Sequence, residues 1–480
     1  METIHFKTVD PLSQELLREA AKKGIELNWE RFEKQQPQDG FLRLGLSCPY
    51  GCMQGPCRID PFGRGADKGI CGLDRDTMAA ASLLRIALQG ALEADAAACW
   101  DDSCSCNENC GASPEEDTDE EECDVDEEDI SGAVKLLARP SASAEILVIQ
   151  ALRLGLLTVG LAEQADSPGM AGSRNIRAGY GLLAGEAIRI AVTGQIDECL
   201  VEEILAEASE MKNPELQLLS LGNWIAAGDA YLPLVCTSGE AEILVSSGKF
   251  NLLLAGDGAD PGVLNLCDKL KIPVVCDCDI PAGEIISLAR KAFEHRIPAS
   301  FSPDAALIGN ASVSLGTDEV NGFLQAGQAT KVALLGGADS LLQSLGHLPV
   351  ELAKALRGAD YSVASWGDAA IWMLKQDLPV AVLDDQSGPL AVVLAMKEAG
   401  RLNNLAGICF TGLQSCRDFA LALGLAALGL KVAIATPIPL WGSEMVRGLL
   451  KDILAEEGGS LAYFDHPAPA EEILDWFLQS

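Results

Sequence analysis

Residues 251–275, NLLLAGDGADPGVLNLCDKLKIPVV, contain the pattern that decides the fold class. An apolar run at 251–256 is followed by a helical pattern at 262–270 and by a second apolar run at 272–275. Two similar units follow. One has apolar runs at 332–336 and 362–365 with a helical pattern at 350–356 between them. The other has apolar runs at 407–411 and 432–436 with a helical pattern at 416–428 between them. Short apolar strands that alternate with helices are typical of parallel sheets with right-handed crossovers. The sequence therefore predicts an α/β protein with two Rossmann-like domains, each a doubly wound parallel sheet.

The first part of the chain has a different pattern. Helical spacing of apolar residues is present at 11–35, 75–98, 142–162 and 176–209. We therefore expect an N-terminal α-helical domain at 1–220, a first Rossmann-like domain at 221–300 and a second at 301–480.

An acidic insertion interrupts the predicted helical domain at about residues 100–130. Twelve of the fifteen residues at 115–129 are acidic, so we expect this segment to be solvated and mobile. The insertion region also carries Cys99, Cys104, Cys106, Cys110 and Cys123. These cysteines are candidates for a second metal site, but their spacing matches no standard ligand pattern and the negative charge opposes an anionic cluster.

The composition excludes several classes of function. A formal net charge of −35 disfavours nucleic acid and anionic membranes as partners, because phosphate binding needs clustered Lys and Arg. The N-terminus has no signal-peptide pattern, and no apolar stretch indicates a membrane span. Sixteen cysteines in a chain without a signal peptide indicate metal and thiol chemistry rather than disulfides. We therefore expect a cytoplasmic protein.

Four cysteines lie in a glycine-rich segment at residues 48–72, CPYGCMQGPCRIDPFGRGADKGICG. Cys48, Cys52 and Cys57 fall within ten residues, and Cys71 follows in the same segment. Irregular backbone of this kind can surround a compact group and direct N–H groups at its sulfurs, which suits a [4Fe–4S] cluster held by four thiolates. Two alternatives remain open: a zinc knuckle, which usually pairs its ligands as two short Cys-x2–4-Cys units, and a set of reduced thiols without metal.

The sequence around these cysteines resembles the N-terminus of the anaerobic nickel–iron carbon monoxide dehydrogenases, whose more distant relatives are the hybrid-cluster proteins. The resemblance is carried by TVDPLSQELLREAAKKGIELNWERFEKQQPQDGF from Thr8 and by CMQGPCRIDPFGRGADKGICGLD up to Asp74. It continues more weakly through KVALLGGAD, LQSCRDFA and PLWGSEMV. The resemblance implies a helical domain followed by two Rossmann-like domains. It also implies that Cys48, Cys52, Cys57 and Cys71 match the ligands of the family's [4Fe–4S] relay cluster within the subunit.

The chain departs from the family where further clusters are expected. Asp39 and Ser47 stand at the positions of two cysteines that hold a cluster across the family's dimer axis, and oxygen ligands are poor replacements for thiolates there. We therefore expect no bridging cluster, so that a homodimer would rest on protein contacts alone. A monomer and an association with another subunit stay open.

The catalytic nickel–iron–sulfur site of the family is also depleted in this chain. The alignment places Gly258, Gly337 and Asp368 at three of its cysteine positions. Cys236 and Cys416 keep sulfur, and are either remnant ligands or small buried apolar side chains. The expected histidine is missing from 216–230, and Met445 replaces a proton-donating lysine of the family. Further oxygen and sulfur atoms that could rebuild a site belong to Asp257, Asp260, Asp339, Cys267, Cys276 and Cys278.

Two classes of function follow from these observations. The first is an iron–sulfur protein with one [4Fe–4S] cluster, which serves in electron transfer or as a partner protein, with a low-potential redox partner such as a ferredoxin. The second is an oxidoreductase that acts on CO or another small molecule at a remodelled second iron–sulfur or nickel–iron cluster. The depletion of several independent elements of CO chemistry favours the first.

Overall fold

The computed structural model describes most of the chain. The described residues are 6–36, 39–100, 127–165, 172–210, 214–276, 280–296, 299, 301–314, 322, 331–384, 388–464 and 466–479. The acidic insertion with Cys104, Cys106, Cys110 and Cys123 lies outside this set, as do Cys278 and the side chain of Cys99. The predictions for these cysteines therefore stay predictions.

The chain forms two compact units, each assembled from segments that are distant in the sequence. Unit 1 consists of Met1–Gln36, Ala171–Thr330 and Ala338–Ala391. Unit 2 consists of Pro37–Met170, Lys331–Gly337 and Val392–Ser480. The three-domain division predicted above stays a prediction.

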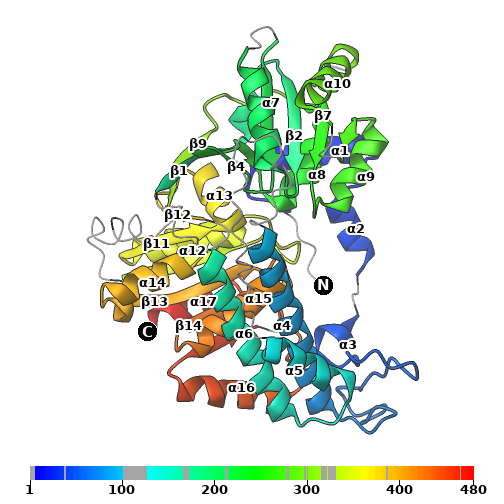
Figure 1. Ribbon diagram of the computed structural model, residues 1–480, viewed down its shortest axis with the longest axis vertical. Helices are drawn as coiled ribbons and strands as arrows, with labels where there is room; N and C mark the ends of the chain where they lie inside the picture. Colours follow the sequence, from blue (N-terminus) through cyan, green and yellow to red (C-terminus); the bar gives the residue numbers. More distant parts are fainter. Residues whose placement is uncertain are drawn as a thin grey trace, which may run out of the picture. The chain divides into compact units, whose positions relative to one another are not determined.

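Unit 1 is an α/β unit that begins with two N-terminal helices (Figure 1). Its helices are α1 (Pro11–Lys22), α2 (Asn28–Lys34), α7 (Glu198–Glu210), α8 (Ala241–Val245), α9 (Pro261–Leu270), α10 (Ala282–His295), α12 (His347–Gly358) and α13 (Gly367–Lys375), with 3-10 turns η1 (Tyr180–Leu183) and η2 (Ser238–Glu240). Its strands are β1 (Ser173–Ala178), β2 (Ile188–Thr193), β3 (Leu216–Leu221), β4 (Ala226–Ala227), β5 (Ala230–Tyr231), β6 (Leu234–Cys236), β7 (Leu252–Ala255), β8 (Val274–Val275), β9 (Gly309–Ser314), β11 (Tyr361–Trp366) and β12 (Ala381–Leu383).

The sheet of unit 1 is mixed and mostly parallel. Its strands follow the order β11-β12-β9-β1-β6-β3-β2-β7-β8. Neighbours along this order are parallel except β1 and β9, which pair antiparallel from Ser173 opposite Ser314 to Ala178 opposite Gly309. The prediction of an α/β protein with N-terminal helices is confirmed, but the expectation of purely parallel sheets was wrong at this pair of strands.

The central strands of unit 1 are buried on both faces. On one face Ala191, Leu219 and Leu253 pack against residues of α1, α8 and α9. On the other face Ile190 and Leu218 pack against residues of α7 and α10. Because neither face meets water, these strands are apolar in nearly every position, as is usual for parallel strands between two helix layers.

Unit 2 combines long helices with a smaller parallel sheet (Figure 1). Its strands follow the order β15-β14-β13-β10, and all neighbours are parallel. The strands are β10 (Lys331–Gly337), β13 (Leu405–Gly412), β14 (Lys431–Ile434) and β15 (Ser460–Tyr463). The helices are α3 (Gly40–Arg43), α4 (Arg75–Trp100), α5 (Glu127–Ala138), α6 (Ala144–Ala165), α14 (Leu390–Glu398), α15 (Cys416–Ala427), α16 (Glu444–Glu456) and α17 (Ala470–Leu478), with the 3-10 turn η3 (Leu402–Asn404).

The helices α4, α6 and α15 form the core of unit 2 through close backbone packing. A Cβ on Gly155 of α6 would lie 2.7 Å from the backbone nitrogen of Gly424 in α15, so only glycine permits this approach. Of the described helices, α6 alone is long and apolar enough to span a membrane by length and composition, over Ala144–Gln164. It is a core helix of unit 2, because most of that stretch is buried between its neighbours.

One sequence prediction of secondary structure was wrong. Residues 176–209 were expected to be helical, but they contain the end of β1, then η1, β2 and most of α7. β2 is buried at every position and only six residues long, and so short a buried segment is hard to distinguish from part of a helix by its sequence pattern. Its β-branched Ile188, Ile190 and Val192 favour the strand.

Candidate functional site

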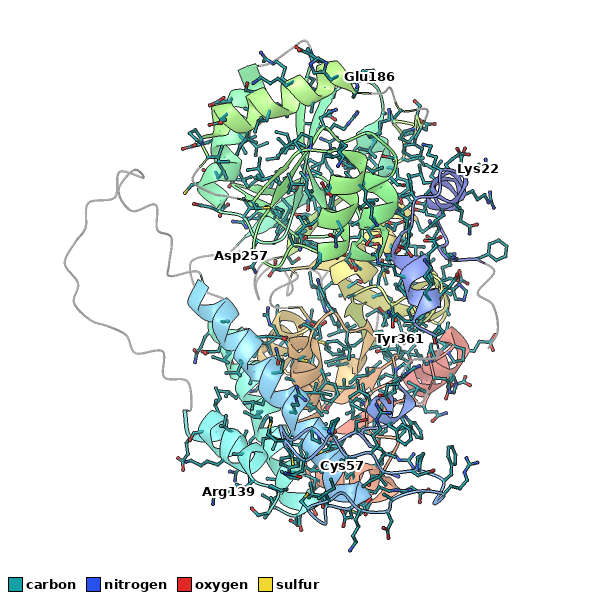
Figure 2. All side chains as sticks on the ribbon, turned by 90° about the vertical axis from the view of Figure 1, so that its right-hand side faces the viewer. Lys22, Cys57, Arg139, Glu186, Asp257 and Tyr361 are labelled. Atoms are coloured by element: carbon teal, nitrogen blue, oxygen red, sulfur yellow. The ribbon has the colours of Figure 1, made fainter. Side chains whose placement is uncertain are left out.

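The four loop cysteines lie in unit 2, in irregular backbone between α3 and α4. Cys57 is labelled in Figure 2. The backbone N–H of Cys48 donates to the carbonyl of Cys57 at 2.9 Å, which brings two parts of the loop together. Two further N–H groups point at sulfur. Gln54 N donates to Cys52 Sγ and Ile70 N donates to Cys57 Sγ, each at 3.4 Å.

The four thiols affect one another electrostatically. Burial raises the pKa of Cys48, and the charges of Cys57, Cys71 and Cys52 raise it further, while a hydrogen bond with the backbone of Tyr50 opposes the change. Gly69 lies beside Cys57, because a Cβ on Gly69 would be in van der Waals contact with Cys57 Sγ at 3.6 Å. The loop therefore brings the other three thiols near enough to influence Cys48, and two of its N–H groups donate to sulfur.

A zinc knuckle and an iron–sulfur cluster require different distances between the four ligand sulfurs. In the described part of the chain, no three Cys, His, Asp or Glu side chains are close enough to hold a single metal ion. Zinc requires such closeness, because its ligands lie at about 2.0–2.3 Å from one ion in a tetrahedron. A [4Fe–4S] cluster binds its four thiolates through four different irons. Its ligand sulfurs therefore lie farther apart than those around one ion.

Asp39 and Ser47, which flank the loop, have local structural roles. The Asp39 carboxylate accepts from the backbone N–H of Phe41 at 3.0 Å at the start of α3 and pairs with Arg58 at 3.1 Å. Ser47 pairs with Arg58 through the backbone, and its buried Oγ has no hydrogen-bond partner among the described residues. The arginine compensates the charge of Asp39 within the chain.

In unit 1, Cys236 at the end of β6 is fully buried. It packs among apolar residues, including Val235 and Leu244, and burial raises the pKa of its thiol well above the usual value, as does the charge of Glu240. This environment favours the neutral thiol rather than the thiolate that metals require. Cys267 on α9 is also buried, which raises the pKa of its thiol to about 12.

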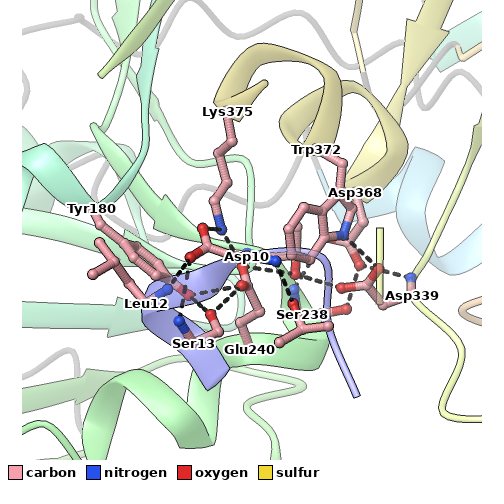
Figure 3. Close-up of polar contacts among 12 residues, drawn as sticks. Asp10, Leu12, Ser13, Tyr180, Ser238, Glu240, Asp339, Asp368, Trp372 and Lys375 are labelled. Carbon is pink, nitrogen blue, oxygen red and sulfur yellow. Dashed lines mark hydrogen bonds and ion pairs between the residues drawn. The ribbon is translucent and has the colours of Figure 1, made fainter. Parts of the chain in front are cut away.

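Asp368, which was placed at a cysteine position of the family's catalytic site, accepts several hydrogen bonds (Figure 3). It lies in the first turn of α13, and its carboxylate accepts from Ser238 N at 3.1 Å, Ser238 Oγ at 2.5 Å and Asp339 N at 2.9 Å. Both oxygens of Asp368 are therefore occupied by donors within unit 1.

Asp339 lies beside Asp368 and is also enclosed. Its Oδ1 accepts from Trp372 Nε1 at 2.7 Å, and its Oδ2 accepts from the Thr237 hydroxyl. Burial raises the pKa of both carboxyls, and for Asp339 the charge of Asp368 raises it further. Two neighbouring buried carboxylates cannot both ionise cheaply, so this pair holds a proton more tightly than a solvated aspartate does.

A buried lysine lies on the other side of this group (Figure 3). Lys375 Nζ pairs with Glu240 Oε2 at 2.7 Å and with Asp10 Oδ2 at 3.1 Å. Glu240 also accepts from the hydroxyls of Ser13 at 2.6 Å and Tyr180 at 2.7 Å. Burial alone lowers the pKa of Lys375, but the two carboxylates outweigh it and raise the pKa overall, so the lysine stays charged.

These residues form a continuous polar network in unit 1, drawn in Figure 3. Its members are Asp10, Ser13, Tyr180, Thr237, Ser238, Glu240, Asp339, Asp368, Trp372 and Lys375. Asp339 and Asp368 were predicted from the sequence as oxygen ligands, but Glu240 and Lys375 were not. No local motif marks them, because residues 10, 240 and 375 meet only through the tertiary fold.

The remaining predicted positions do not offer metal ligands either. In unit 2, Gly337 (φ +104°) has no space for a side chain, because a Cβ there would lie 2.1 Å from the Gly412 carbonyl oxygen. Cys416 is the first residue of α15. A Cβ on Gly90 of α4 would lie 2.2 Å from the carbonyl oxygen of Cys416. In unit 1, Gly258 leaves open space around its α-carbon.

Comparison with known proteins places these features in context. No family model matches the chain. A stretch of 90 residues, 19% of the chain, is 51% identical to carbon monoxide dehydrogenase 1 of Methanosarcina mazei and covers 14% of that protein. A stretch of 84 residues, 18% of the chain, is 50% identical to carbon monoxide dehydrogenase 1 of Carboxydothermus hydrogenoformans and covers 13% of it.

The fold of the whole chain agrees with these partial matches. Carbon monoxide dehydrogenase IV of C. hydrogenoformans superposes with a TM-score of 0.79 at 19% identity, over 98% of both chains. The chain therefore has the fold of a carbon monoxide dehydrogenase, and about a fifth of its sequence is similar to carbon monoxide dehydrogenases. A nickel-free carbon monoxide dehydrogenase from Thermococcus sp. AM4 gives a TM-score of 0.78 at 18% identity, over 100% of this chain and 98% of the other. The sequence similarity is thus confined to a small part of the chain, whereas the likeness of fold extends over nearly all of it.

Proposed function

We propose that this chain is an iron–sulfur redox protein that holds one [4Fe–4S] cluster at Cys48, Cys52, Cys57 and Cys71. The observation that carries the proposal is the loop itself, in which N–H groups point at the sulfurs of Cys52 and Cys57. Such donors stabilise the negative charge of thiolates and of the cluster bound to them. A bound cluster of this type supplies a one-electron reduction couple. This couple supports electron transfer to a low-potential partner protein in the cytoplasm as the function of the chain.

The alternative function, oxidation of CO at a second cluster, finds little support in the side chains of unit 1. Cys236 is buried as a neutral thiol, and both oxygens of Asp368 accept hydrogen bonds from protein groups. A soft, multi-metal cluster needs several deprotonated thiolates, and carboxylates favour harder ions. We therefore derive no catalytic step through a nickel–iron group in this chain.

Cluster binding at the loop is tested by replacing one ligand. The anaerobically purified chain is expected to show the visible absorption of an iron–sulfur cluster and, after dithionite reduction, the EPR signal of a reduced [4Fe–4S] cluster. The variant Cys57→Ser is expected to lose most of its iron and this signal, because three thiolates remain where four are needed.

A matched control is Cys276→Ser, which alters an exposed cysteine of unit 1. This variant is expected to keep its iron. Unchanged iron content and absorption in Cys57→Ser would contradict the proposal.

A further inference from the structure

Positively charged side chains gather at the amino ends of strands β2 and β7 in unit 1. Arg189 is the second residue of β2, and Lys249 lies three residues before β7, which is the parallel neighbour of β2. Arg296 immediately follows α10 and pairs with Glu186, which lies two residues before β2. Figure 2 labels Glu186 at this end of the strands and Asp257, which follows β7, toward the other. The group is therefore separate from the carboxyl ends of the strands, where parallel sheets usually bind ligands.

Two of these cations are buried without a counter-ion. Lys249 is 7% exposed and Arg189 is 2% exposed. Among the described residues, the ammonium of Lys249 has no hydrogen-bond or ion-pair partner. The guanidinium of Arg189 donates there only to uncharged acceptors, which are Gln217 Oε1 at 3.0 Å and two backbone carbonyls at 2.8 and 3.3 Å. Lysine and arginine are almost never buried in this way unless they are paired.

The neighbouring carboxylates do not compensate these charges. Glu186 and Glu215 attract Arg189 only from a distance, since neither forms an ion pair with it. The side chain of Glu186 is 62% exposed and is already paired with Arg296, and Glu215 is exposed. Burial lowers the pKa of Lys249, and the charge of Arg189 lowers it further against the opposing charge of Glu186. An anion bound beside Lys249 and Arg189 would supply the missing negative charge.

A buried amide beside Arg189 also lacks a partner. Asn251, which directly precedes β7, is 3% exposed. Its Oδ1 accepts from the backbone N–H of Arg189 at 2.8 Å, and its own backbone N–H donates to the carbonyl of Arg189 at 2.9 Å. Its Nδ2 is buried and has no hydrogen-bond partner in the described part of the chain. Such donors are rare in native proteins, so Asn251 and Lys249 give two independent indications that a ligand supplies an acceptor here.

We infer that Arg189, Lys249 and Asn251 form a binding site for a phosphate group. Two buried cations match the charge of about −2 that a phosphate ester carries near neutral pH, and its free oxygens match the ammonium, guanidinium and amide donors. A carboxylate offers one charge and two oxygens. Since the net charge of −35 repels anions from the chain as a whole, a local group of cations is needed for one to bind. The inference does not depend on the proposed cluster, because all three residues belong to unit 1 and the four loop cysteines belong to unit 2.

The test measures binding of inorganic phosphate to the anaerobically purified full chain by calorimetry, in a phosphate-free buffer at constant ionic strength. Glycerol 3-phosphate and acetate are titrated in the same way. Both phosphates are expected to bind at least about tenfold more tightly than acetate, because they carry more charge and more acceptor oxygens. Tighter binding of glycerol 3-phosphate than of inorganic phosphate would identify an organic phosphate as the ligand, and the reverse order would identify free phosphate; either order supports the site.

The variant Lys249→Met separates a ligand-binding lysine from a structural one. It is expected to weaken phosphate binding at least about tenfold, because it removes a charge that contacts the ligand. The control Lys354→Met removes an exposed lysine of α12 in the same unit, and is expected to change the affinity less than about twofold. In phosphate-free buffer, Lys249→Met should unfold in urea at a midpoint no lower than that of the unmodified chain, because it removes a buried charge that has no partner.

The variant Asn251→Asp supplies the negative charge from within the chain. It keeps the shape of the side chain and the acceptor for the N–H of Arg189, and it places a carboxylate beside the two cations. In phosphate-free buffer this variant is expected to unfold at a higher urea midpoint than the unmodified chain. Its affinity for phosphate is expected to fall at least about tenfold, because the added charge repels the anion.

Three results would overturn the inference. The first is absence of phosphate binding, or binding no tighter than that of acetate. The second is an affinity for phosphate that stays unchanged in Asn251→Asp, which also serves as the test if Lys249→Met does not fold. The third is a Lys249→Met protein that is destabilised equally with and without phosphate, since this would give the lysine a structural role alone.

Discussion

Replacement of Lys375 by methionine is expected to destabilise unit 1 strongly. Lys375 is the cation that compensates two carboxylates, Glu240 at 2.7 Å and Asp10 at 3.1 Å. The side chains of Lys375, Glu240 and Asp10 are only 4%, 0% and 11% exposed. Methionine fills a similar volume but carries no charge, so the variant leaves two carboxylates without a cation.

The magnitude follows from the burial of this group. Removing one partner of a buried ion pair costs about 3–5 kcal/mol, because the other charge stays uncompensated. The lysine also lies over the rings of Tyr180 at 4.1 Å and Trp372 at 4.3 Å, and each such contact contributes about 0.5–2 kcal/mol. These contributions overlap, so we expect a loss of about 3–5 kcal/mol in the free energy of unfolding. That is a large part of the roughly 5–15 kcal/mol that stabilises a domain.

The assay is urea unfolding followed by tryptophan fluorescence, with Lys375→Met compared against the unmodified chain. The predicted loss lowers the urea midpoint by at least about 1 M. The control Lys354→Met removes an exposed lysine of α12 that pairs with Glu351 at 3.0 Å, and should cost less than about 1 kcal/mol. The double variant Lys375→Met/Glu240→Gln should recover part of the loss, since it removes one uncompensated carboxylate. A midpoint for Lys375→Met equal to that of Lys354→Met would refute the reasoning.

Three further outcomes are expected. The raised pKa values of Asp339 and Asp368 mean that the native state keeps protons on this pair above the usual aspartate pKa. The free energy of unfolding should therefore fall as pH rises from that usual value through the raised pKa. Urea titrations at several pH values should show that the variant Asp339→Asn flattens this dependence. Nickel-reconstituted protein should not reduce viologen under CO at a rate typical of its relatives; robust activity that disappears in Cys236→Ala/Cys416→Ala would show the opposite. Because Asp39 pairs with Arg58 within the chain and offers no thiolate, iron chelation should leave the oligomeric state unchanged in light scattering, whereas chelation-dependent dissociation would indicate a bridging cluster.

The parts of the structure that the sequence predicted are those determined locally. The strands and helices at 251–275 and 405–434 were recognisable because each apolar run lies beside its own helix and pairs with the next strand. The cysteine loop was recognisable for the same reason, since all four cysteines lie within residues 48–71. Residues 176–209 were misread because β2 is short and buried at every position, and its neighbours in the sheet, β3 and β7, come later in the chain.

The polar network could not be predicted from local pattern. Asp10, Glu240 and Lys375 come from three distant segments and meet only once the sheet of unit 1 has formed. Glu240 follows Thr237 in a short turn, where it is easily taken for a solvated capping residue. Only its complete burial shows that it must be paired, and nothing in the residues around it identifies Lys375 as the partner.

The central claim is that the chain holds one cluster in the cysteine loop and no nickel–iron cluster. Metal and sulfide analysis of anaerobically purified protein, produced with added iron and nickel, tests it most directly. The account predicts about four irons and four sulfides per chain and no stoichiometric nickel. Eight or more irons per chain, or one nickel per chain, would contradict it.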